Sequence, residues 1–193
     1  WSSDVCSSDL ENEADISQNK TFAQSNLMKC YYEKKDYPNS VIYAEKVLMN
    51  PKTDDNVKSD AQIIIARAAI QTGDEAKART AYAKLITIAK GELAAEALYY
   101  DAYFKNKDEK FEASNVAVQK LAKNYSGYKY FGAKGLVLMA KNFYGLKDSY
   151  QATYILENVI QNFTDFPDVI SEAQTELDAI KSEESKTNSS IIK

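Results

Sequence analysis

A small residue returns along this chain at a nearly constant interval. Ser40, Ala78, Ser114 and Ala152 are separated by 38, 36 and 38 residues. A period of about 20 to 50 residues is the sequence signature of a solenoid, in which copies of one supersecondary unit stack in series. The period therefore restricts the chain to repeat architectures.

The residues around each small residue repeat with the same period. Four residues later, and again three residues after that, the chain is apolar: Ala44, Tyr82, Val118 and Leu156, then Val47, Leu85, Leu121 and Val159. This spacing places the apolar side chains on one face of a helix. A second helix-forming run precedes each small residue by twelve positions, at Met28, Ala66, Ala102 and Ala140. The predicted unit is a hairpin of two helices.

Short turns are expected between the two helices of each unit. We place them near Lys35-Asp36, Gly73-Asp74, Lys107-Asp108 and Lys147-Asp148. A hairpin of this size cannot bury both apolar stripes alone, so neighbouring hairpins must stack to form a continuous core. In the third unit Asp101 and Lys105 stand where core residues are expected. This pattern predicts that the first helix of that unit is shifted by one residue.

These units resemble tetratricopeptide repeats, which are pairs of antiparallel helices of about 34 residues. The second unit carries the resemblance best, through Ala66, Gly73-Asp74, Ala78, Tyr82 and Leu85. The resemblance implies an all-α, tetratricopeptide-like helical-hairpin solenoid with a C-terminal closing helix. The expected repeats cover about 20–51, 56–90, 92–125 and 130–164, and the closing helix, opened by Pro167, covers 167–181.

Both ends of the sequence differ from the repeats. Residues 1–10 contain Ser-Ser-Asp twice and resemble translated adapter sequence, so we interpret them as a non-native leader. We therefore expect the chain to be the C-terminal part of a longer protein, with any signal peptide and upstream repeats missing. Residues 182–193 are polar and lack an apolar period, which predicts a disordered tail.

The composition argues against several classes of function. The chain has no histidine, which is the most frequent general base and metal ligand, and its six glycines form no phosphate-binding loop. We therefore expect no enzymatic activity and no catalytic, cofactor-binding or metal-binding residues. The net charge is −4, with acidic and basic residues interspersed, so no nucleic-acid partner is expected. The apolar runs are too short for a membrane span.

The resemblance also implies a binding surface, because first helices line the concave face of a tetratricopeptide array. Helical spacing from the small residues gives a candidate peptide-binding face of Lys29, Ile63, Arg67, Tyr99, Tyr103, Val137 and Lys141. Its basic groups favour a protein or peptide partner with acidic segments. The alternative for Tyr99 and Tyr103 is that they fill the core of the irregular third unit. The pattern lacks the Lys and Asn constellation of the chaperone-binding members of the family.

The resulting hypothesis is a non-catalytic protein-protein interaction scaffold. Units longer than 34 residues are similar to those of bacterial cell-envelope proteins of this group, which favours a periplasmic or envelope location over a cytoplasmic one. Two alternatives stay open: a repeat module of a signalling or regulatory protein, and a helical-repeat solute-binding envelope lipoprotein. The envelope lipoprotein would need large insertions between helices, which this sequence does not have.

Overall fold

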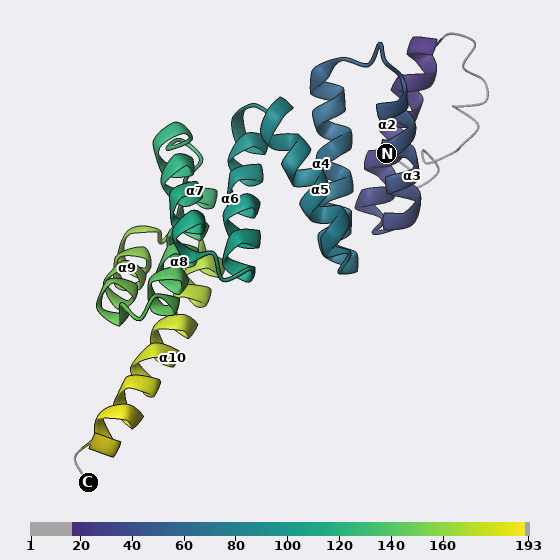
Figure 1. Cartoon of the computed structure of the whole chain (residues 1–193). Coiled ribbons are helices and arrows are strands. Elements are labelled where there is room, and N and C mark those ends of the chain that lie inside the picture. Colours follow the sequence, from purple (N-terminus) through teal and green to yellow (C-terminus); the bar gives the residue numbers. More distant parts are fainter. Residues whose placement is uncertain (1–16, 192–193) are drawn as a thin grey trace. The chain divides into compact units, whose positions relative to one another are not determined.

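Helices follow one another along the part of the chain that the computed structural model describes, residues 17–191, and these residues form no strand (Figure 1). Four hairpins and a final helix make up the order: α2 (Ser17–Glu33) with α3 (Tyr37–Met49), α4 (Asp55–Thr72) with α5 (Glu75–Ile88), α6 (Gly91–Lys107) with α7 (Phe111–Asn124), α8 (Lys129–Gly145) with α9 (Ser149–Asn162), and α10 (Pro167–Ile191). The all-α, helical-hairpin fold class predicted from the period is confirmed.

The small residues lie where the period predicts them, at the contacts between the helices of each hairpin. Ser40, Ala78, Ser114 and Ala152 are fully buried, and so are their first-helix counterparts Met28, Ala66, Ala102 and Ala140. In two hairpins the small residue is a serine whose hydroxyl is satisfied locally. Ser40 Oγ donates to the carbonyl of Met28 at 2.9 Å, and Ser114 Oγ to that of Ala102 at 2.8 Å. Serine therefore replaces alanine without leaving a buried polar group unpaired.

The turn inside each hairpin has the same backbone. Lys35, Gly73, Glu109 and Lys147 all adopt positive φ, between 58° and 76°. At each turn two amide groups donate back to the carbonyls of the preceding helix, as in a Schellman motif. Three of the four second helices are then capped by an aspartate side chain, from Asp36, Asp74 or Asp148. The turn is thus a repeated element in its own right.

The third turn differs from its predicted position. We placed it near Lys107-Asp108, but the residue with positive φ is Glu109, and the N-cap position belongs to Lys110, which makes no side-chain capping hydrogen bond. The reason is that the turn follows the period of 38, 36 and 38 residues, whereas the aspartate is two positions early. The predicted one-residue shift of the first helix is also wrong, because Ala102 is fully buried in register.

The described residues up to Ala97 and those from Leu98 onward form two compact units, and the boundary falls inside α6. In the first unit α4 packs against α2, α3 and α5. In the second unit α8 packs against α7, α9 and α10. In both units a first helix therefore contacts the next first helix as well as its own partner, which is how stacked hairpins share a core.

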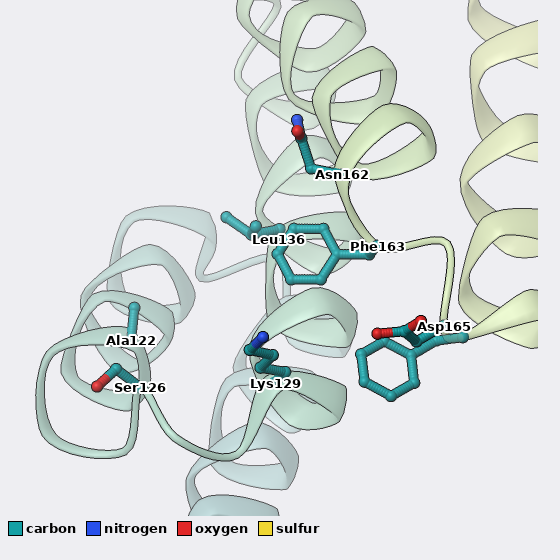
Figure 2. A pocket seen from close by; sticks show the side chains of 9 residues that line it. Ala122, Ser126, Lys129, Leu136, Asn162, Phe163 and Asp165 are labelled. Atoms are coloured by element: carbon teal, nitrogen blue, oxygen red, sulfur yellow. The ribbon is translucent and has the colours of Figure 1, made fainter.

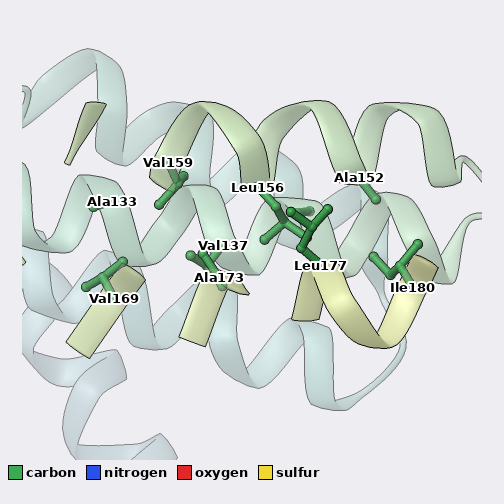
Figure 3. Packing of buried hydrophobic residues seen from close by; sticks show 10 residues of the cluster. Ala133, Val137, Ala152, Leu156, Val159, Val169, Ala173, Leu177 and Ile180 are labelled. Carbon is green, nitrogen blue, oxygen red and sulfur yellow. The ribbon is translucent and has the colours of Figure 1, made fainter. Parts of the chain in front are cut away.

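The core of the second unit shows the contribution of the closing helix (Figure 3). Val169, Ala173, Leu177 and Ile180 of α10 are buried against α8 and α9. The residues that they meet are Ala133, Val137, Ala140, Ala152, Leu156 and Val159. The closing helix begins at Pro167, as predicted. The last hairpin thereby receives a cover for its apolar face.

The prediction for the C-terminal end of the chain can be compared with the structure. The tail predicted to be disordered from residue 182 continues as helix α10 to Ile191. The helix extends past Ile180, the last residue of α10 whose side chain is described as buried, with exposed polar side chains such as Ser182 and Glu183. The predicted leader, residues 1–10, lies outside the described residues. None of the described helices combines the length and the apolar character that a bilayer crossing requires.

Candidate functional site

Two residues of the predicted peptide-binding face belong to the core instead. Ile63 is 4% exposed and Val137 is 1% exposed. Both lie three residues before a buried alanine of a first helix, Ala66 or Ala140, and residues three apart share one face of a helix. Their helix face is therefore the one that packs inward, and neither side chain can line a groove.

The two tyrosines of the predicted face have different positions. Tyr99 is buried, with its ring 6.1 Å from that of Phe131, and burial raises the pKa of its hydroxyl. Tyr103 is half-buried, and its ring lies 6.4 Å from that of Tyr99 and 5.5 Å from that of Phe104. Core packing, the alternative that the sequence left open, describes Tyr99. Only Tyr103 keeps part of its side chain at the surface.

The basic residues of the predicted face are each matched by a carboxylate from the next first helix. Lys29 Nζ of α2 lies 2.6 Å from Asp60 Oδ2 of α4. Lys141 Nζ of α8 lies 2.7 Å from Glu172 and 3.0 Å from Glu176 of α10. Burial alone would lower the pKa of Lys141, but the hydrogen bonds to the two glutamates outweigh it and raise the pKa.

Arg67 makes the most buried of these pairs. Its Nε and Nη2 atoms donate to the two oxygens of Glu96 at 2.9 and 2.5 Å. Glu96 also accepts a hydrogen bond of 2.9 Å from the hydroxyl of Tyr82. The Glu96 side chain is 5% exposed, whereas that of Arg67 is 40% exposed. Hydrogen bonding to Glu96 raises the pKa of Arg67. The guanidinium thus compensates a buried carboxylate and is not a free positive charge.

These pairs follow the repeat. Each cation directly follows the buried small or apolar residue of its first helix: Lys29 after Met28, Arg67 after Ala66, and Lys141 after Ala140. Each carboxylate, Asp60, Glu96 or Glu172, lies six residues before the equivalent position of the next first helix, which is 66, 102 or 178. Sequence reasoning identified the cations and missed their partners. The signal was present, because the partners are separated by 31, 29 and 31 residues, close to one repeat. Lys29, Arg67 and Lys141 therefore do not form a strip of uncompensated positive charge on the surface.

A pocket of about 410 Å³ lies at another edge of the second unit, where two interhelical linkers come together. We call it the linker pocket. Its lining comes from the end of α7, the start of α8 and the connection from α9 to α10: Ala122, Ser126, Lys129, Gly132, Leu136, Asn162, Phe163, Asp165 and Phe166. In Figure 2, Ala122 and Ser126 lie on one side of this pocket and Asp165 on the other, with Lys129 between them. The sequence pattern did not predict a cavity there.

Neither a protein-family model nor a curated protein matches this sequence. The indications of function therefore come from the surface of the chain itself.

Two tyrosines form an exposed aromatic pair on α9. Tyr150 is 75% exposed and Tyr154 is 57% exposed. They are four residues apart, so they lie on the same face of the helix, which we call the α9 tyrosine face. The opposite side of α9 is already packed, because Ala152, Leu156 and Val159 are fully buried. The two rings are thus not required to fill the core of this unit.

Proposed function

We propose that this chain is a non-catalytic scaffold, a tetratricopeptide-like array that binds another protein through its surface. The observation that carries the proposal is the α9 tyrosine face. Tyr150 and Tyr154 expose most of their aromatic surface beside a core that does not need them. Tyrosine is enriched at protein interfaces, where it combines a large apolar area with a hydroxyl that can hydrogen-bond.

The proposed partner differs from the one expected from the sequence alone. An acidic peptide would be attracted by free positive charge, but Lys29, Arg67 and Lys141 already face carboxylates. The surface that remains favours a partner with an apolar patch or cleft that can bury the two rings. The proposed location in a bacterial cell envelope rests on the resemblance to envelope repeat proteins.

The test is to capture partners from a cell extract with the wild-type chain and with the double variant Tyr150→Ser/Tyr154→Ser. Loss of an interface hot spot costs about 2 kcal/mol or more, which corresponds to roughly 30-fold weaker binding. We expect the captured protein to bind the double variant at least that much more weakly, with the thermal melt of the variant unchanged.

The matched control is Gln151→Ser/Gln161→Ser, which replaces two exposed glutamines of the same helix. This control should bind as the wild type does. Partner capture that is equal for the wild type and the tyrosine variant would contradict the proposal, as would the absence of any protein that binds the wild type with saturation.

A further inference from the structure

We propose that the linker pocket binds one aromatic or branched aliphatic side chain of a partner peptide, with an acidic group of that peptide against Lys129 and a basic group against Asp165. This inference rests on the proposed scaffold function, because it specifies the chemistry of part of a protein partner. It concerns a surface separate from the α9 tyrosine face.

Two linkers of the same construction form the pocket. Residues 125–128 connect α7 to α8, and residues 163–166 connect α9 to α10. In both linkers the last amide donates to the first carbonyl at 3.0 Å, and aromatic residues occupy both ends: Tyr125 and Tyr128 in one, Phe163 and Phe166 in the other. The two linkers are 38 residues apart, so they occupy equivalent positions in successive repeats.

The other two linkers between the described hairpins do not have this construction. The connection from α5 to α6 consists of Ala89 and Lys90 alone, which corresponds to the shorter interval of 36 residues. The connection from α3 to α4 has no aromatic residue, and its polar side chains turn back onto the helices. Asn50 donates to the hydroxyl of Thr21, and buried Thr53 donates to the carbonyl of Val47.

The apolar floor of the pocket is held in place by the core. Leu136, Phe163 and Phe166 are half-buried and pack against the buried cluster of α8, α9 and α10. One side of each side chain therefore rests on a close-packed interior, while the other side lines the pocket. A floor fixed in this way loses little conformational entropy when a ligand binds. The site is thus preorganised for an apolar group.

Two charged residues at the rim of the pocket indicate which groups should lie on either side of the apolar group of the ligand. Lys129 and Asp165 are both exposed, and neither forms an ion pair with another residue that the structure describes. A purely hydrocarbon ligand would leave both charges without a partner. A peptide segment with an apolar residue between one acidic and one basic residue would complement the floor and both charges. The volume lies at the lower end of the range of about 300 to 1,000 Å³ found for ligand pockets, which suits a single anchoring residue.

Gly132 provides a way to close the pocket without disturbing the fold. It lines the pocket from the first turns of α8, and a Cβ added to it would meet no atom within 4 Å. Gly132→Leu should therefore fill the cavity while replacing a residue that disfavours helix. Gly127→Leu is the matched control, because Gly127 also has open space around its Cβ position and does not line the pocket.

The experiment is an NMR titration of the full chain with two blocked peptides, acetyl-EAFAK-amide and acetyl-KAFAE-amide, which offer the two orders of charge. We expect saturable shifts of the amide signals of Ser126, Lys129, Gly132 and Asp165 with one of them, and at least tenfold weaker binding of the corresponding peptide with Ala in place of Phe. Gly132→Leu should abolish these shifts, and Gly127→Leu should keep them. The charge exchange Lys129→Glu/Asp165→Lys should reverse the preference between the two peptides, whereas Lys120→Glu should leave it unchanged.

Three results would overturn the proposal: no localised shifts, equal binding of the Ala peptide, or binding that survives Gly132→Leu. If the wild type instead associates with itself and Gly132→Leu abolishes that association, the occupant is a second copy of the chain and the peptide assignment is wrong. Failure of the peptide test, together with partner capture that still depends on Tyr150 and Tyr154, would refute the pocket assignment and leave the scaffold function standing.

Discussion

Replacing Arg67 by alanine should unfold the chain far more readily than the same change at the other cations of the repeat. Glu96 would lose both guanidinium hydrogen bonds and keep only the bond from the Tyr82 hydroxyl. The Glu96 side chain is 5% exposed, so its carboxylate would be left with little access to water. Removing one member of a buried ion pair costs about 3 to 5 kcal/mol, since an uncompensated charge remains inside.

Two variants at the same repeat position serve as internal references. Lys29 and Asp60 are 49% and 39% exposed, so Lys29→Ala should cost less than about 1 kcal/mol. Lys141 and its glutamates are 30% to 39% exposed, and Lys141→Ala should also cost no more than about 1 kcal/mol. The expected order of destabilisation is therefore Arg67→Ala well above both lysine variants, although all three remove one cation that faces at least one carboxylate.

The assay is urea unfolding followed by far-UV circular dichroism, with the free energy taken from the linear extrapolation. The double variant Arg67→Met/Glu96→Leu removes both charges together and should recover most of the stability lost in Arg67→Ala. An Arg67→Ala protein as stable as Lys29→Ala would show that water reaches Glu96 and would refute the reasoning. So would a double variant no more stable than Arg67→Ala, because the loss would then come from packing and not from the unpaired carboxylate.

Three further predictions concern the turns, the crossings and the response to alkali. Lys110→Asp should supply the N-cap that, among the four described hairpins, only the third lacks and add about 1 kcal/mol, so an unchanged melting temperature would count against it. Ala78→Leu and Ala152→Leu should each overpack a fully buried crossing and cost about 1 to 3 kcal/mol, and two unchanged melts would show that the register is wrong. Burial and the hydrogen bond to Asp168 raise the pKa of Tyr130 to about 12, from about 10 in the unfolded chain, so its contribution is complete below pH 10 and is lost as the pH rises toward 12. Tyr130→Phe should therefore reduce the loss of stability across that window, and an equal loss in both proteins would exclude this cause.

The period predicted the fold well because it reports on packing. Small residues at fixed intervals mark the places where helices approach closely, and each of the eight predicted crossing residues is fully buried. The errors arose where a local signal was preferred to the period. Asp108 resembles a helix cap, but the turn formed two residues later because Schellman geometry and core register fix the backbone together. Likewise, polar Asp101 and Lys105 do not displace α6, since they pair with each other at 2.7 Å on its half-buried side.

The candidate site was harder to predict, because a single helix does not reveal what faces it. Helical spacing assigned Lys29, Arg67 and Lys141 to a candidate peptide-binding face, but it did not show that their charge is compensated by carboxylates about 30 residues away. Ile63 and Val137 were misplaced for a simpler reason. A residue three positions from a buried alanine lies on the same helix face and is buried with it. The linker pocket needs two linkers to meet in space, which the spacing of either one alone does not show.

The third junction between first helices is the exception among the charge pairs. Residues 60, 96, 134 and 172 occupy the carboxylate position, but at 134 the chain has Lys134, and the preceding cation position holds Tyr103. Lys134 Nζ lies 5.0 Å from the ring centroid of Tyr99 and 5.7 Å from that of Tyr130. A cation over aromatic faces is stabilised by the ring quadrupole, so it can replace a carboxylate contact at this junction without leaving a charge uncompensated. At this junction a cation therefore faces an aromatic ring of the adjoining first helix, Tyr99, where the other three junctions have an ion pair.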